Sequence, residues 1–387
     1  MPYDFDRLID RRSTESIKWR AYDEDVLPLW VADMDFPAPE PVIRALHERV
    51  AHGILGYAMA PQGLREVIQE RLARLYGWHV APEAIVFTPG VVSAFHVACR
   101  AVGRTGDAVI VEPPVYFPML DAPALRGRRR LEVPLVEHDG YYERDLNSFR
   151  KAIDARTSLL LLCSPHNPVG RVFTRQELEG LAAACLEHHV VICSDEIHCD
   201  LALSGHPHIP TAALAPEVAA RTITLMAPSK TYNIPGLGCA VAVIPDPQLR
   251  KSFEKAAEGI VPHVNVLGYA ATLAAYRDGQ EWLDEVLAYL EGNCDTLLAF
   301  LAAEMPTLRC RRPEATYLAW IDCRAAGLPG SPQAFFLEHA RVALNDGAAF
   351  GTGGAGFVRL NLACPRSRLL EALERMRQAV LRAAAER

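Results

Sequence analysis

Residues 190–198 read VVICSDEIH, an apolar run that ends in Ser194, Asp195 and Glu196. A short run of this kind, rich in β-branched residues, is typical of a buried strand. Similar runs recur along the chain at 84–87, 108–111, 159–163, 222–226 and 239–244. Between them lie amphipathic stretches such as 175–188, with apolar residues at helical spacing. This alternation predicts βα units, and so an α/β fold whose mostly parallel sheet is flanked by helices.

The pattern changes towards the C-terminus. Residues 268–303 form a long helical pattern, followed by short alternating segments at 316–321 and 356–362 and a final helix from Arg366. We therefore predict a large domain over 45–275 and a smaller α+β domain. A connecting helix and the C-terminal part form this smaller domain over 276–387, and the N-terminal segment 1–44 joins it.

Composition narrows the classes of function. The 387 residues are 50% hydrophobic and carry a net charge of −7, which argues against a general nucleic-acid binder. The apolar runs are far shorter than the ~20 residues of a membrane span, and the first residues lack the apolar core of a signal peptide. Ten cysteines without a Cys-x-x-Cys pair indicate reduced thiols in the cytoplasm and no metal site. The basic run 126–130 is expected to be a solvated loop.

Five of the predicted strands end in polar residues. These ends read TPGVV (88–92), EPPVY (112–116), SPHNPVG (164–170), SDEIH (194–198) and APSKT (227–231). Ligands of open parallel sheets bind beyond the carboxyl ends of the strands. Each motif alone is commonplace, since turn residues often follow strands. Together, a phosphate-type turn, an aromatic ring, an amide, a carboxylate and a lysine predict a pocket for a phosphorylated, aromatic, nitrogen-containing aldehyde.

Four longer motifs carry a family resemblance. They are LWVADMDF (29–36), DEIH (195–198), SKTYNIPG (229–236) and VRLNLACPRS (358–367), in this order along the chain. The sequence resembles the fold-type-I pyridoxal 5′-phosphate (PLP) enzymes of the class I/II aminotransferase superfamily, and more narrowly the cystathionine β-lyase or C–S lyase branch. The similarity runs essentially from end to end. It implies a PLP cofactor and a homodimer with shared active sites.

Lys230 is the expected catalytic lysine. The chain has only five lysines, and Lys230 alone follows an apolar strand and precedes a Gly-rich turn. The other four stand in polar or charged stretches, at Lys18, Lys151, Lys251 and Lys255. The resemblance implies that Lys230 forms the aldimine with PLP and later removes the Cα proton of the substrate. It also implies that Asp195 keeps the pyridine nitrogen protonated, where a turn or cap role is the ordinary alternative.

The resemblance assigns further cofactor contacts. Asn167 would bind the phenolic oxygen, and Tyr116 would stack on the ring. His198 stands where aminotransferases usually carry Tyr, so it either contacts the same oxygen or is structural. For the phosphate, the expected groups are the helix start at Gly90, Val91 and Val92, with Ser229 and with Tyr57 from the neighbouring subunit.

Two positions depart from related aminotransferases. These commonly place a Ser three residues before the lysine and an Arg eight after it, both on the phosphate. Here the positions hold Ala227 and Gly238. We therefore assign no phosphate-binding arginine and expect the backbone amides, Ser229 and Tyr57 to hold the phosphate.

Arg359 lies among apolar residues in FVRLNL (357–362), and a charge in such a strand needs a partner. The resemblance supplies the α-carboxylate of the substrate, gripped in a bidentate manner. A structural ion pair is the alternative. Arg366, in the same motif, is expected to cap or pair locally.

The resemblance to the branch favours a carbon–sulfur β-lyase. Such an enzyme cleaves cystathionine or another cysteine S-conjugate, an amino-acid thioether, to a thiol, pyruvate and ammonia. An aminotransferase of the same fold begins with the same steps, since a mobile lysine base serves both reactions. A regulatory or binding protein that keeps the fold is the third hypothesis, and Lys230, Asp195 and Arg359 together argue against it.

Overall fold

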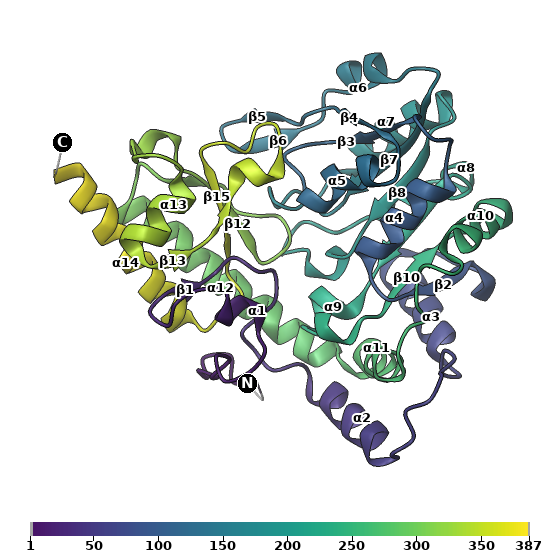
Figure 1. Ribbon diagram of the computed structural model, residues 1–387, viewed down its shortest axis with the longest axis horizontal. Coiled ribbons are helices and arrows are strands. Elements are labelled where there is room, and N and C mark those ends of the chain that lie inside the picture. The colour runs from purple at the N-terminus through teal and green to yellow at the C-terminus, as the bar shows by residue number, and fades with distance from the viewer. Residues whose placement is uncertain (1–2, 386–387) are drawn as a thin grey trace.

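The computed structural model describes residues 3–385 and is built around a seven-stranded sheet (Figure 1). Its strand order is β2-β10-β9-β8-β7-β3-β4. Five consecutive strands of this order, β9, β8, β7, β3 and β4, are parallel to one another. β10 is antiparallel to both of its neighbours, β2 and β9. The strands span β2 (Ile85–Thr88), β3 (Ala108–Val111), β4 (Arg129–Glu132), β7 (Thr157–Cys163), β8 (Val191–Asp195), β9 (Thr222–Met226) and β10 (Ala240–Val243). The predicted α/β fold with a mostly parallel sheet is confirmed.

Helices cover both faces of this sheet, which explains why its inner strands are largely apolar. Leu159 and Leu161 of β7 pack with α4 (Val91–Ala101), α5 (Phe117–Leu125) and α10 (Pro247–Ala257) on one face. Leu160 and Leu162 point the other way, towards α6 (Leu146–Ala152) and α7 (Arg175–Glu187). The side chains of successive strand residues therefore pack into two different hydrophobic clusters, one on each face of the sheet.

A second sheet of four antiparallel strands lies in the C-terminal part, in the order β11-β12-β15-β14. Its strands are β11 (Arg309–Cys310), β12 (Leu318–Asp322), β14 (Asn345–Asp346) and β15 (Phe357–Asn361), and α14 (Arg366–Ala385) follows. Near the N-terminus, β1 (Leu27–Pro28) pairs with β13 (Val342–Ala343). Leu27 and Leu29 thereby enter the same hydrophobic cluster as β12, β15 and α14. The domain boundaries proposed above stay predictions.

Gly279 divides the long helical region into α11 (Val266–Asp278) and α12 (Gln280–Glu304). A Cβ at Gly279 would stand 2.5 Å from the Ala275 carbonyl oxygen. By length and composition α12 could cross a membrane. Its buried side chains, however, pack into two hydrophobic clusters, with Val286 and Leu290 in one and Leu297 and Leu301 in the other, as in a core helix.

The remaining α-helices and β-strands are short or lie at the periphery. They are α1 (Ile17–Arg20), α2 (Glu40–Ala51), α3 (Leu64–Tyr76), β5 (Val136–His138), β6 (Tyr141–Glu143), α8 (Pro216–Ala219), α9 (Pro228–Thr231) and α13 (Pro332–Phe335).

The expected loop at 126–130 was partly wrong. Arg129 and Arg130 begin β4, and Arg128 is buried with its Nε donating to the Cys99 carbonyl oxygen at 2.8 Å. β4 is the edge strand of the sheet, and an edge strand tolerates charged residues where a central strand does not. It therefore lacks the apolar run that marked the others.

Candidate active site

A cavity of about 310 Å³ opens at the carboxyl ends of the central strands. Its lining brings together twelve residues singled out above: Gly90, Val91, Val92, Tyr116, Asn167, Asp195, His198, Ala227, Ser229, Lys230, Gly238 and Arg359. The strand ends thus converge as a parallel sheet requires. Of the expected site residues, only Tyr57 lies elsewhere: its side chain is fully exposed between α2 and α3.

Lys230 lies on α9, the single helical turn that follows β9. Its Nζ donates to the Ala32 carbonyl oxygen at 2.7 Å. Burial, together with the positive charge of Arg359, lowers the pKa of Lys230 to about 8. A large share of an amine with this pKa is neutral near pH 8, as a nucleophile or a general base must be.

Asp195 is the last residue of β8 and is buried. One of its oxygens accepts from the Ile197 backbone N–H at 3.1 Å. Burial raises the pKa of Asp195 to about 7, which means that the charged form is poorly compensated here. A cationic N–H donor in the cavity, such as a protonated pyridine nitrogen, would supply the missing partner.

Arg359 lies in the middle of β15 and is buried. It donates to neutral oxygens only: Nη1 to Asn167 Oδ1 at 2.9 Å, and Nη2 to the Trp30 carbonyl at 3.0 Å and Asn345 Oδ1 at 2.5 Å. Its Nε has no hydrogen-bond partner among the described residues, and no ion pair within 3–385 includes it. Burial lowers the pKa of Arg359 to about 10. A buried guanidinium without a counter-charge is a ready site for a carboxylate.

Two further side chains offer polar atoms to the cavity. Asn167 uses its amide oxygen on Arg359, which directs its amide nitrogen elsewhere. His198 is buried, and its Nδ1 finds no hydrogen-bond partner in the described part of the chain. Burial lowers the pKa of His198 to about 3, so the ring is neutral. Both groups fit a ligand oxygen, and Tyr116 forms part of the wall nearby.

The anion end of the cavity is the start of α4. Gly90 precedes this eleven-residue helix without a capping side chain, and Val91, Val92 and Ser93 line the cavity. The uncapped N–H groups of the first turn fit a phosphate. Gly238 faces the same space with φ of +57°, and a Cβ there would lie 3.3 Å from the Pro89 carbonyl oxygen. Both the positive φ and the close approach to Pro89 therefore disfavour any side chain at position 238.

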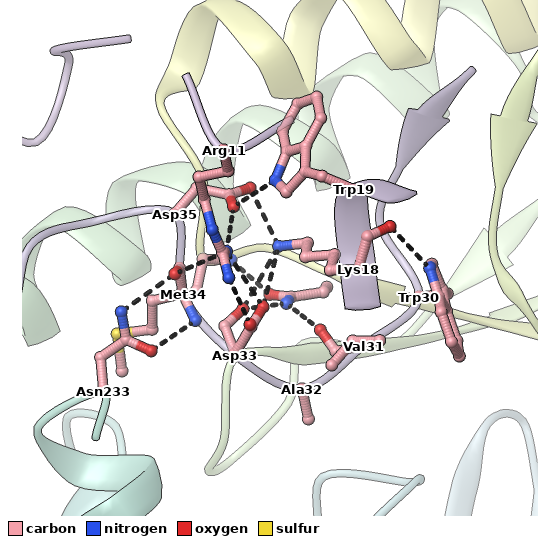
Figure 2. A network of polar contacts seen from close by, with 12 residues as sticks. Arg11, Lys18, Trp19, Trp30, Val31, Ala32, Asp33, Met34, Asp35 and Asn233 are labelled. Carbon is pink, nitrogen blue, oxygen red and sulfur yellow. Dashed lines mark hydrogen bonds and ion pairs between the residues drawn. The ribbon is translucent and has the colours of Figure 1, made fainter. Parts of the chain in front are cut away.

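Sequence reasoning missed the backbone of residues 30–36, shown in Figure 2. The Trp30 carbonyl accepts from Arg359, and the Ala32 carbonyl accepts from Lys230. Every residue has a carbonyl group, so a sequence does not show which carbonyls line a site. Asn345, which also holds Arg359, was missed too. Lys18, placed in a polar stretch, is fully buried and paired with Asp35 at 2.9 Å.

The residues of the cavity fit PLP: an amine for the aldehyde, a carboxylate for the ring nitrogen, an amide for the phenolic oxygen and backbone N–H groups for the phosphate. Comparisons with known proteins agree. Cystathionine β-lyase PatB of Bacillus subtilis is 41% identical over 97% of this chain and 99% of its own length.

Two solved structures share the fold over nearly all of both chains. Cystalysin from Treponema denticola, which contains PLP, is 34% identical with a TM-score of 0.95, over 99% of this chain and 100% of its own. The PLP-bound C-S lyase from Staphylococcus hominis is 34% identical with a TM-score of 0.92, over 98% of each chain. The family model "Aminotransferase class I and II" matches residues 24–376. The chain therefore belongs to the class I and II aminotransferase family, in the branch that contains the cystathionine β-lyases.

Proposed function

We propose that the protein is a PLP-dependent carbon–sulfur β-lyase that acts on cystathionine or another cysteine S-conjugate. The observation that carries the amino-acid chemistry is the meeting of three buried ionisable groups in one cavity: the Lys230 amine, the Asp195 carboxylate and the unpaired Arg359 guanidinium. The choice of carbon–sulfur cleavage over amino-group transfer rests on the relatives named cystathionine β-lyase. An amino-acid substrate needs all three.

PLP, when bound, supplies an electron sink for the bond that breaks at the substrate Cα. Asp195 would keep its pyridine nitrogen protonated, while Asn167 and His198 would face its phenolic oxygen and Tyr116 its ring. The N–H groups at Gly90, Val91 and Val92, with the Ser229 hydroxyl, would hold the phosphate.

The remaining steps belong to Arg359 and Lys230. Arg359 holds the α-carboxylate, which orients the substrate in the cavity. The neutral Lys230 amine then takes the Cα proton. The Cβ–S bond breaks, its electron pair leaves on sulfur as a thiolate, and the thiolate takes up a proton. With one water, the three-carbon remainder becomes pyruvate and ammonia.

The proposal includes a homodimer. Tyr57 cannot serve the cavity of its own chain, because it is fully exposed and does not line it. Exposed apolar side chains surround it in sequence, at Val50, Ile54, Leu55 and Met59. Such a patch favours an interface, and a second copy would bring Tyr57 to the phosphate. We also place the protein in the cytoplasm, because its ten cysteines are free thiols.

Incubation with cystathionine, or with a panel of S-substituted cysteines, tests the proposed reaction. The expected result is release of a free thiol and pyruvate in equal amounts with no keto acid present. Lys230→Ala should form neither product and serves as the control. If amino-group transfer occurs only after a keto acid is added, the protein is an aminotransferase and the lyase proposal fails.

A further inference from the structure

A largely buried cluster of charges lies beside the cavity, and the proposed reaction gives it no role. It consists of Arg11, Lys18, Asp33 and Asp35 (Figure 2). Arg11 pairs with both acids: its Nη2 lies 2.7 Å from Asp33 Oδ2, and its Nη1 lies 2.6 Å from Asp35 Oδ1. Lys18 Nζ lies 2.9 Å from Asp35 Oδ2 and 3.5 Å from Asp33 Oδ1. Trp19 Nε1 also donates to Asp35, at 2.9 Å.

The two acids belong to the 30–36 segment, whose carbonyl groups are nearly all engaged. On the cavity side, Ala32 accepts from Lys230 and from the Tyr317 hydroxyl at 2.9 Å, and Trp30 accepts from Arg359. Asn361 binds the carbonyls on either side of Ala32, each at 2.6 Å. The carbonyl that receives the Lys230 amine is thus fixed between two anchored neighbours.

The far end of the segment is tied to the turn that directly follows α9, the helix that carries Lys230. Asn233, three residues after Lys230, accepts from the Met34 N–H at 2.9 Å and donates to the Met34 and Phe36 carbonyls at 2.9 and 2.7 Å. Arg11 also donates to the Met34 carbonyl at 3.2 Å. The cluster and Asn233, just beyond α9, therefore both hold the Met34 backbone.

The charges of the cluster balance, with two cations and two anions. Lys18 is fully buried, and Asp35 is only 7% exposed. Buried charges tolerate few arrangements, because each displaced partner leaves another charge uncompensated. The cluster is therefore suited to fixing the position of the backbone that carries Asp33 and Asp35.

We propose that Arg11, Lys18, Asp33 and Asp35 are positioning residues that hold the 30–36 segment so that the Ala32 and Trp30 carbonyls place the Lys230 amine and the Arg359 guanidinium for reaction. The Ala32 carbonyl would then bind the Lys230 amine whenever that amine is not bonded to the cofactor. The inference rests on the proposed function only for the roles of Lys230 and Arg359 in the reaction.

Two variants remove opposite charges from the cluster: Asp35→Asn and Arg11→Gln. Asp25→Asn is the matched control, because Asp25 pairs with Arg341 at 2.7 Å and also ties the N-terminal region to the C-terminal part, but does not touch the 30–36 segment. The first readout needs no reaction. The full-length chain without PLP is treated with acetic anhydride, and mass spectrometry gives the acetylation rate of Lys230 relative to the exposed Lys151.

A displaced Ala32 carbonyl frees the amine, so both variants should acetylate Lys230 severalfold faster than the wild type, and Asp25→Asn should not. Opposite shifts in the two variants would show that the cluster acts through its net charge and would overturn the positioning role. So would wild-type rates in both variants. If Asp35→Asn fails to fold, Arg11→Gln decides alone, because Arg11 is partly exposed and Lys18 still pairs with both acids.

The second readout is turnover with PLP bound, measured on folded protein. The value of kcat should fall about tenfold or more in both variants, because a misplacement near 1 Å in a reacting group can cost around a hundredfold. KM for the amino acid should rise as Arg359 loses the Trp30 carbonyl. If the cluster were merely structural, the substitutions would lower the thermal unfolding midpoint but leave kcat and KM of the folded protein unchanged. If the wild type cleaves no thioether, the proposed function fails, while the acetylation result still decides the positioning role.

Discussion

Lys230 and Asp195 show how burial changes the pKa of single residues. Each loses most of its hydration in the cavity, and each pKa moves towards neutrality, to about 8 for Lys230 and about 7 for Asp195. The shifts have opposite signs because burial disfavours the charged form of both the amine and the acid. In the chain without PLP, both groups therefore change charge within the physiological range.

For Lys230 this shift can be measured directly. Acetylation of Lys230 in the PLP-free chain should rise with a midpoint near pH 8, because the amine reacts only when deprotonated, whereas an ordinary lysine titrates near 10.4. Arg359→Met should move the midpoint to higher pH, since it removes a neighbouring positive charge that lowers the pKa of Lys230. A midpoint near pH 10 in the wild type would contradict the prediction.

Asp195 and Asn167 should differ in their importance. Asp195→Ala removes a buried charge partner, a loss of about 3–5 kcal/mol, or roughly a hundred- to several thousandfold in kcat. Asn167→Ala removes one hydrogen bond to a charged oxygen, about 1.5–3 kcal/mol. It should also raise KM, because Asn167 orients Arg359 at 2.9 Å. Steady-state kinetics on folded variants saturated with PLP test this order, and equal losses in kcat would refute it.

Much of the site could be predicted at this scale, because reactive side chains are visible in a sequence. Lys230, Asp195 and Arg359 were found in this way, and all three line the cavity. The Ala32 and Trp30 carbonyls were not, since any residue carries a carbonyl group. The burial of Lys18 was also invisible, because its partners Asp33 and Asp35 are matched to it only by the folded backbone.

At the scale of elements, the phosphate end of the cavity depends on the approach of two backbone segments. Gly238, at φ +57°, passes close to Pro89, just ahead of α4. Gly238→Ala should destabilise the protein by roughly 1–2 kcal/mol, because alanine is strained at positive φ. It should also weaken PLP retention by pushing Pro89 and the start of α4 out of place.

Thermal unfolding and dialysis against PLP-free buffer measure these two effects. Gly205→Ala provides a control, because Gly205 also has positive φ but open space around it and lies outside the cavity lining. It should lose similar stability and keep its PLP. Equal PLP retention in the two variants would mean that the contact with Pro89 does not matter.

The elements themselves were predictable to different degrees. β3, β7, β8 and β9 are covered on both faces, so their sequences are continuous apolar runs that reveal them. β4 pairs on one side only and begins with two arginines, so the same reasoning placed Arg129 and Arg130 in a loop. The break between α11 and α12 at Gly279 was also missed, because a single glycine inside a helical pattern is compatible with a continuous helix.

At the scale of the whole molecule, the proposed dimer predicts complementation between two defective variants. Arg359→Ala should raise KM for α-amino acids about tenfold or more, as expected for the loss of charge-assisted hydrogen bonds worth ~1.5–3 kcal/mol. Tyr57→Phe should instead weaken PLP retention at a phosphate site with few side-chain donors. In a mixed dimer with shared sites, one site carries both defects and the other neither, so activity should partly return.

Subunit exchange must be shown independently, for example by mass spectrometry of differently tagged chains. Each parent variant alone, carried through the same exchange protocol, is the control. Absence of recovery despite exchange, with a measurable defect in each parent, would place Tyr57 and Arg359 in the site of one chain and refute the shared-site arrangement.

The long-range contacts of the 30–36 segment also affect how the protein folds during its synthesis on the ribosome. Val31 and Asn361 are separated by 330 positions, and Trp30 and Arg359 by 329. At about 5–20 residues per second, the segment emerges roughly 15–65 seconds before the partners that fix it. During that time the large sheet can form, while the 30–36 segment still lacks its contacts with Arg359 and Asn361. A nascent chain halted before β15 would thus carry Lys230 without a finished cavity around it. Such a chain would expose its apolar N-terminal residues to chaperones and proteases.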